Sequence, residues 1–97
     1  MSLKEKLLSN MKEAMKAKDS VKLGTVRSVI SAVKNQEIEL KKELNEEEIL
    51  TIVSREVKKR KEASVLYEKG NRPELKDKEI QEMKILQTYL PEQVSER

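Results

Sequence analysis

The chain contains no cysteine, histidine, tryptophan or phenylalanine, and it has only two tyrosines. Without cysteine it can form no disulfide and offers no thiolate nucleophile or cysteine metal site. Without histidine an ordinary zinc site is not expected, and the most common general base of enzymes is missing. Two aromatic rings also leave almost no means of stacking nucleic-acid bases. These absences argue against a self-sufficient enzyme, a zinc protein and a base-stacking domain.

Long apolar runs are absent as well. The longest uninterrupted run covers three residues, Val65 to Tyr67, whereas a membrane-spanning helix needs about 20. The N-terminal stretch MSLKEKLLSNMKEAMK is amphipathic and charged, unlike a signal peptide. The sequence therefore predicts a soluble, cytoplasmic protein with no membrane partner.

The 97 residues are enough for one small domain with a single core. Charged residues make up 40% of the chain, and 21 basic against 18 acidic side chains give a net charge of +3. Basic groups outnumber acidic ones by ten to six in residues 1–44, but acidic groups lead by six to four in residues 73–97. A basic first half suits a surface that faces a polyanion, although a net charge of +3 is weak support.

Apolar residues recur at helical spacing in four segments, and no segment alternates like a strand. The first predicted helix covers residues 3–17, where Ser2 and Glu5 have the spacing of a capping box. The second predicted helix follows Asp19 as its N-cap and continues to about Leu44. Both helices present one apolar stripe, so we expect them to pack against each other or against the rest of the chain.

The third predicted helix begins after Asn45, which has the capping-box spacing with Glu48, and Gly70 suits the C′ position at its end. The fourth begins at Pro73 and ends before Pro91. The sequence therefore predicts an all-α fold, an antiparallel bundle of about four principal helices.

Two positions in the second predicted helix depart from an ideal amphipathic pattern. Gly24 lies inside the helix, where glycine costs ~1 kcal/mol relative to alanine. Glu37 falls within the apolar face formed by Val26, Val33 and Leu40 when each residue advances about 100° around the helix. A charge on a core face needs a partner.

Motifs for catalysis are missing. The chain has no glycine-rich phosphate loop, no dinucleotide fingerprint and no nucleophile elbow. The chain has serines and threonines but no histidine that could act as a base to activate them, and no cysteine that could serve as the nucleophile instead. Glu46, Glu47 and Glu48 are of the type that holds a hard cation, but the dipole of a helix start accounts for them better. We therefore expect no catalytic residue, no metal and no cofactor.

A basic run in the third predicted helix is the most informative charged feature. At about 100° per residue, Arg55, Lys58 and Lys59 share an outer face, and Lys61 lies on its flank. These four residues are candidates for contacts with nucleic-acid phosphates. An ordinary solvated helix face accounts for the same pattern.

Arg60, in the middle of that run, falls instead on the core face with Val53 and Val57. Glu56 lies four residues earlier and is its expected ion-pair partner. A pair between Arg60 and Glu37 is not expected, because an antiparallel hairpin separates them by about 10 Å along the axis. Glu37 is left to pair with the first or fourth helix, or to join Arg60 as a docking site for another module.

Three stretches of the chain resemble the YqeY family, whose fold is shared with the tail of the B subunit of glutamyl/aspartyl-tRNA amidotransferase. The stretches are Met1 to Asp19, Arg27 to Leu40, and Arg55 to Glu96. The strings KNQEIE and YLPEQVSE are the most specific parts of the match. Pro73 departs from the pattern, since an aspartate cap is expected at that position.

The resemblance implies a longer protein, with a helical N-terminal body followed by a smaller three-helix module. On this basis residues 1–91 are expected to form the helical bundle of a GatB/YqeY-type domain. Residues 92–97 are expected to begin the C-terminal module, which is then truncated.

The resemblance also implies a function: a non-catalytic accessory domain that binds tRNA or a tRNA-processing partner. The partners it suggests are tRNA, aminoacyl-tRNA and an amidotransferase-related protein. Two alternatives remain open. The chain can be a component of a glutamine-dependent carbon–nitrogen ligase, as in tRNA amidotransferase, or a protein–protein adaptor without nucleic acid.

Overall fold

The computed structural model describes residues 2–91, which fold into four helices with no strand among them. In chain order these are α1 (Leu3–Ala17), α2 (Ser20–Leu40), α3 (Glu46–Lys69) and α4 (Pro73–Gln87). The predicted all-α bundle is confirmed. The expected start of a further module, at residues 92–97, lies outside the described residues.

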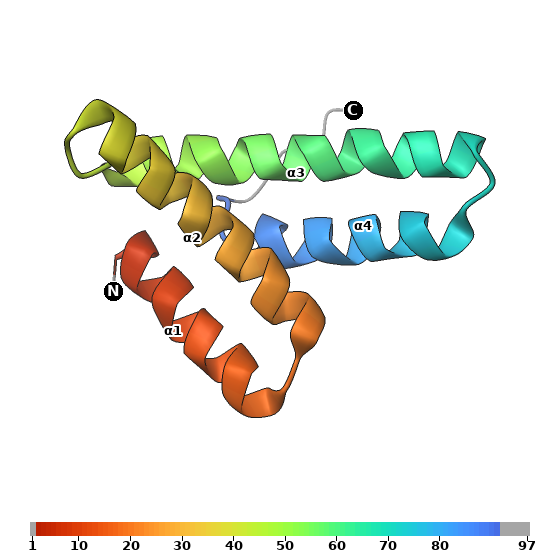
Figure 1. Ribbon diagram of the computed structural model, residues 1–97, viewed down its shortest axis with the longest axis horizontal. Coiled ribbons are helices and arrows are strands. Elements are labelled where there is room, and N and C mark those ends of the chain that lie inside the picture. The colour runs from red at the N-terminus through yellow and green to blue at the C-terminus, as the bar shows by residue number, and fades with distance from the viewer. Residues whose placement is uncertain (1, 92–97) are drawn as a thin grey trace.

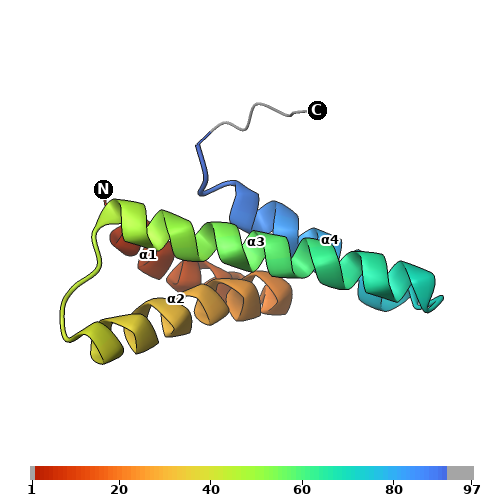
Figure 2. The same ribbon diagram turned by 90° about the horizontal axis from the view of Figure 1, so that it is seen from above.

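The helices form two antiparallel hairpins that cross (Figure 1). One hairpin pairs α1 with α2, and the other pairs α3 with α4. Viewed from above, α2 lies on one side of α3, and the end of α4 lies on the other side (Figure 2). Both hairpin turns project away from the crossing, so each hairpin has an arm that the other does not cover.

Three predicted N-caps are confirmed. The Ser2 hydroxyl accepts a hydrogen bond from the Glu5 amide at 3.1 Å, and the Glu5 carboxylate accepts one from the Ser2 amide at 2.9 Å. The Asp19 carboxylate accepts from the Lys22 amide at 3.1 Å. Asn45 and Glu48 form the second reciprocal box. Each cap satisfies amide groups that the first helical turn leaves unpaired, and this fixes where three of the helices begin.

The predicted end of α2 at Leu44 is wrong, because the helix stops at Leu40. Lys41 adopts the left-handed conformation, with φ 57°, and turns the chain out of the helix. The turn brings the Leu44 side chain into the core as part of the connection to α3. Apolar spacing alone does not distinguish a helical core residue from one in a following turn.

The ends of α3 and α4 also differ from expectation. Gly70 has φ −86°, and Asn71 adopts the left-handed conformation instead, with φ 58°. Asparagine tolerates that region better than most residues, so the turn does not need the glycine there. The last turn of α4 ends at Gln87, and Thr88, Tyr89 and Leu90 continue as turns held by bonds to carbonyls three residues earlier.

The core lies where the hairpins cross. Its fully buried members come from all four helices: Leu7, Val26, Val29, Val53 and Leu86. Apolar residues near the projecting turns are covered less. Met15 is 49% exposed, although it belongs to the apolar stripe of α1, and Leu66 near the end of α3 is 67% exposed. The crossing therefore decides which parts of each apolar stripe are buried.

Candidate nucleic-acid interface

The basic run lies on α3, a helix anchored by buried residues on its opposite side. Ile49 and Val53 are buried against the crossing, whereas Arg55, Lys58, Lys59 and Lys61 are exposed. Among residues 2–91, Arg55, Lys58 and Lys61 form no ion pair. The outer side of α3 thus presents cations whose charge is not neutralised by a neighbouring carboxylate contact.

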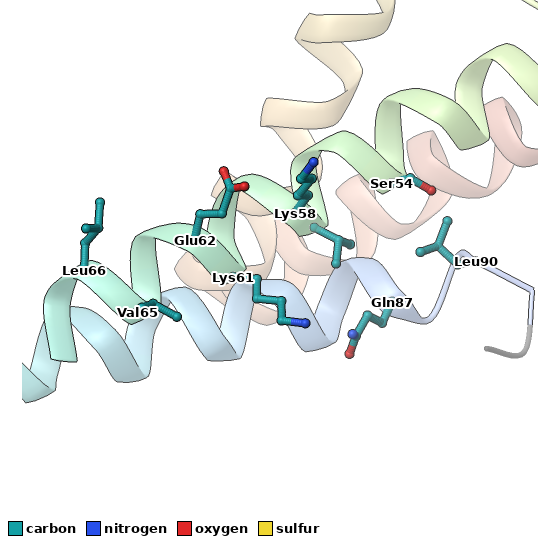
Figure 3. Close-up of a pocket in the computed structure, with 9 residues that line it drawn as sticks. Ser54, Lys58, Lys61, Glu62, Val65, Leu66, Gln87 and Leu90 are labelled. Carbon is teal, nitrogen blue, oxygen red and sulfur yellow. The ribbon is translucent and has the colours of Figure 1, made fainter. Parts of the chain in front are cut away.

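Lys58 and Lys61 line a groove of about 750 Å³ between the second half of α3 and the end of α4 (Figure 3). Lys61 extends toward α4 and Gln87, whereas Lys58 and Glu62 point away from α4. The lining also includes apolar residues and one hydroxyl: Ser54, Val57, Val65, Leu66 and Leu90. The groove therefore combines an apolar floor with two cations and one carboxylate.

Arg55 faces a different hollow. It lines a pocket of about 200 Å³ at the end of α2, together with Gln36, Leu40 and Leu44. The helical angles grouped Arg55 with Lys58 and Lys59 on one face. The structure places Arg55 toward the α2–α3 connection and Lys58 beside the groove with α4. Arg55 and Lys58 have different surroundings because the α2–α3 connection lies beside one and α4 beside the other. The positions of these neighbours cannot be derived from helical angles.

Lys59 forms an ion pair with Glu56, a buried residue on the core side of α3. Its ammonium group lies 3.3 Å from a Glu56 carboxylate oxygen, although the Lys59 side chain is 71% exposed. Of the four basic candidates it is the one already engaged by a carboxylate of the described chain. A phosphate contact by Lys59 therefore has to compete with this ion pair.

Arg60 lies at the centre of a nearly enclosed ionic cluster. Its guanidinium group is 2.7 Å from the Glu56 carboxylate on α3 and 3.0 Å from the Glu82 carboxylate on α4. It also donates to the Glu56 carbonyl at 3.1 Å. The sequence predicted the Glu56 contact, but it did not reveal Glu82, because that contact depends on the register between α3 and α4.

The pKa values in this cluster reflect competition between burial and pairing. Burial raises the pKa of Glu56, but the hydrogen bonds from Arg60 and Lys59 outweigh it, so the pKa of Glu56 is lowered. Burial likewise lowers the pKa of Arg60, and the two carboxylates outweigh it to raise that pKa. Both residues are held charged, so the cluster acts as an ionic clamp between α3 and α4.

Glu37 forms a separate set of contacts, away from the Arg60 cluster. Its carboxylate accepts a hydrogen bond from the Leu44 amide at 3.0 Å and from the Lys4 ammonium group at 2.9 Å. These bonds lower the pKa of Glu37, the Leu44 amide most strongly. Glu37 thus joins α1 to the α2–α3 connection, and it does not meet Arg60.

Two of the three acidic residues at the start of α3 have structural partners. Glu46 accepts from the Leu3 amide at 2.6 Å, and Glu48 pairs with Lys42 at 3.0 Å besides capping the helix. No group of three or more potential metal-ligating side chains occurs within residues 2–91. In the same part of the chain, no helix is both long and apolar enough to cross a membrane.

One polar contact near the core was not anticipated from the sequence. The Tyr89 hydroxyl donates to the Asn10 side chain at 2.5 Å, and the Lys6 ammonium group lies 5.6 Å from the centre of the Tyr89 ring. Burial, followed by the nearby charge of Glu13, raises the pKa of Tyr89. The contact joins the segment after α4 to α1, and residues 79 positions apart carry no sequence signal of it.

Comparison with known proteins gives curated relatives in yeasts. The chain is 41% identical over 85 residues to "Altered inheritance of mitochondria protein 41, mitochondrial" of Vanderwaltozyma polyspora, covering 87% of this chain and 46% of that protein. The protein of the same name in Kluyveromyces lactis is 37% identical over 84 residues, with 86% and 45% covered. The chain spans about half the length of the curated relatives it matches.

The names of these relatives contradict the expectation of a cytoplasmic location, because they describe mitochondrial proteins. That expectation was wrong for a physical reason. Targeting signals are separate segments read by receptors, so the composition of a folded domain does not reveal them.

The family comparison covers nearly the whole chain. A sequence model described as "Yqey-like protein" matches residues 4–97, which include all four helices except the start of α1. This match agrees with the three stretches on which the sequence resemblance rested. The chain belongs to the YqeY family.

Proposed function

We propose that this domain is an accessory module that binds tRNA through the basic side of α3. The observation that carries the proposal is a set of exposed cations, Arg55, Lys58 and Lys61, that form no ion pair within the described residues. Lysine and arginine contacts to phosphates supply much of the affinity of nucleic-acid binding. Their helix is anchored on its other side by Ile49 and Val53, so it presents them on a fixed support.

The mode of binding follows from the residues that the chain offers. Phosphate contacts position a protein on nucleic acid without reading its sequence. The chain has two tyrosines and no other aromatic residue, so stacking contributes little. Shape and charge recognition of folded RNA is therefore the mode that fits. Lys59 belongs to the same surface, at its edge, where its bond to Glu56 weakens its contribution.

The test is tRNA binding by the variant Arg55→Glu, Lys58→Glu, Lys61→Glu, measured at about 50 and 200 mM salt. Lys59 is left unchanged, because substituting it would also disturb Glu56. We expect weaker binding and a salt dependence that is shallower by roughly 0.7–0.9 for each phosphate that the variant no longer neutralises. Circular dichroism should show the parent's helix content, since exposed charges contribute little to stability.

A matched control makes the same charge change elsewhere. Lys12, Lys78 and Lys84 are exposed and form no ion pair within residues 2–91. Their replacement by glutamate should weaken binding far less than the α3 variant does. Equal reductions in the two variants would mean that only net charge matters, and that α3 is an ordinary solvated face.

A second candidate is a protein–protein adaptor whose partner is an amidotransferase-related protein. It is favoured by the groove beside Lys61, where Val65 and Leu66 are 44% and 67% exposed. Exposed apolar side chains next to each other are more typical of protein contacts than of phosphate contacts. Unchanged tRNA binding by the α3 variant would reject the first candidate and leave this one.

A further inference from the structure

The outer side of α2 carries a second set of cations. Arg27, Lys34 and Lys41 are exposed and recur every seven residues. At about 100° per residue Arg27 and Lys34 lie within about 20° of each other around α2, and Lys41 is the left-handed residue that directly follows the helix. Successive members are about 10 Å apart along the helix axis. None of the three forms an ion pair within residues 2–91.

Of the two carboxylates on α2, Glu37 lies nearer to these cations: it follows Lys34 by three residues, and after the Leu44 amide and Lys4 the charge of Lys34 contributes to lowering the pKa of Glu37. Glu37, about 80° from Arg27 around the helix, is turned toward Lys4 and the Leu44 amide. Glu39 lies about 120° from Arg27, on a different side. Between the cations, the surface presents Ser31 and Ile38, both uncharged and exposed. No carboxylate lies between Arg27 and Lys34 in the sequence, and Glu37 flanks the cations between Lys34 and Lys41.

Gly24 belongs to the same side of α2, about 60° from Arg27. The fold does not require a glycine there. An added Cβ would meet no atom within 4 Å, and the residue has no positive φ. Glycine is nevertheless among the poorest residues for a helix interior. Close approach of the backbone to a ligand is one of the uses of glycine, and Gly24 leaves room for such an approach on the outer side of α2.

We propose that the outer side of α2, comprising Gly24, Arg27, Lys34 and Lys41, is a second contact surface for the phosphate backbone of the same RNA. The inference rests on the proposed function and extends it from one helix to two. The cations supply charge complementarity, and their spacing places each of them at its own phosphate. Gly24 lets the RNA backbone come closer to the helix than a side chain would allow.

The two surfaces approach each other at one end. Arg55 of α3 lines a pocket together with Gln36 and Leu40 of α2. Lys41, the last of the three cations, directly follows Leu40, which lines the same pocket. A folded RNA lying across this end of the molecule is thus within reach of both helices.

Gly24 provides a test in which stability and binding move in opposite directions. Gly24→Ala and Gly24→Gln should both favour the folded state, by up to about fivefold in the folding equilibrium for alanine. Both should weaken binding to a tRNA transcript, and glutamine should weaken it more than alanine because it is larger. If the two variants are more stable and bind tRNA as well as the parent, Gly24 faces solvent and this part of the proposal is wrong.

The cations are tested with Arg27→Ala and Lys34→Ala combined. We expect about tenfold weaker tRNA binding and a salt dependence that is shallower by roughly 1.4–1.8. The matched control is Lys78→Ala with Lys84→Ala on α4, which removes two exposed cations from another helix. Equal effects of the two double variants would overturn the proposal.

The outcomes separate this inference from the proposed function. If the α3 variant loses tRNA binding and the α2 variants do not, only the α2 surface is rejected. If the parent does not bind tRNA, both proposals fail. Vesicles containing anionic lipid serve as a second probe. Binding to them that depends on Arg27 and Lys34, without binding to tRNA, would assign the outer side of α2 to a membrane surface and also overturn the proposal.

Discussion

On its core side α3 holds Arg60, only 12% exposed and paired with Glu56 and Glu82, whereas on its outer side Arg55 and Lys58 are exposed and unpaired within the described chain. The same residue types therefore have two different roles within five positions of one helix. A charge removed from water must be matched at short range, and its loss damages the fold. A charge left in water contributes little to the fold and stays available to a partner.

The largest expected effect comes from breaking the core side. Arg60→Ala leaves Glu56 and Glu82 facing each other without the arginine, in an environment that already disfavours the charge of Glu56. We expect it to lower the free energy of unfolding by about 3 kcal/mol, the lower end for a broken buried pair, because the cluster keeps some exposure. Urea denaturation measures this change.

The control for Arg60 removes all three charges together. Arg60→Met combined with Glu56→Gln and Glu82→Gln should be more stable than Arg60→Ala alone, because no unpaired charge remains. A triple variant that is as unstable as the single one would show that packing of the arginine stem, rather than its charge, is what matters.

A smaller effect is expected at Glu82, which provides one of the two carboxylate contacts to Arg60. Glu82→Ala should cost about 1.5 kcal/mol, the lower value for a hydrogen bond to a charged group, because Arg60 keeps Glu56. A double-mutant cycle with Arg60 should show non-additive changes, since the two residues are in contact. Additive changes would indicate that the α3–α4 bridge contributes no pairwise energy.

The pH dependence of stability tests whether the paired carboxylate of Glu37 stabilises the fold. Its folded-state pKa lies below the ordinary value of 4.5, mainly because it accepts the Leu44 amide. The folded state therefore favours the ionised form. The resulting stability is present above the unfolded pKa and is lost as pH falls through the folded pKa. We expect Glu37→Gln to lower the melting temperature at pH 7, but to leave it nearly unchanged well below the folded pKa.

Glu39, exposed on the same helix and without an ion pair in residues 2–91, is the matched control for Glu37. Glu39→Gln should leave the melting temperature close to that of the parent across the same pH range. If the two variants have parallel pH profiles, the bond to the Leu44 amide does not contribute to the acid sensitivity of the fold.

The smallest effect is expected on the outer side of α3. Arg55→Ala and Lys58→Ala should each change the free energy of unfolding by less than about 0.5 kcal/mol, as usual for exposed surface positions. The same denaturation experiment measures this. A decrease comparable to that of Glu82→Ala would mean that these cations stabilise the fold, and it would weaken the reason for assigning them to a partner.

The sequence predicted those features of α3 and its neighbours that depend on nearby residues. The caps at Ser2, Asp19 and Asn45 and the Glu56–Arg60 pair lie within four positions along the chain. They follow from local geometry, which is the same in any helix. The four helices and their class followed from the same periodicity.

Features that depend on how helices meet could not be predicted. Glu82 reaches Arg60 across 22 positions, and Lys4 reaches Glu37 across 33. For Glu37 the sequence left the first and fourth helices as alternatives, and the structure selects Lys4 on the first. The two pockets that separate Arg55 from Lys58 are completed by α2 and α4, not by α3 itself. Helical angles give the direction of a side chain from its own axis, but not the neighbour that lies there.

The crossing of the two hairpins has a consequence for local unfolding. The core residues Val29 and Val53 are held by several helices, whereas the arm of α3 beyond Ser64 is held chiefly by α4. We therefore expect local opening to cost less free energy in this arm than in the core, so that the protection of amide hydrogens from exchange falls along α3 from Val53 toward Leu66. The groove that contains Lys61 is lined by α3 residues from Ser54 to Leu66, so its far end, at Val65 and Leu66, lies on this less protected arm. We expect a ligand that fills the groove to hold the arm through Val65 and Leu66, and so to slow exchange in residues that it does not touch.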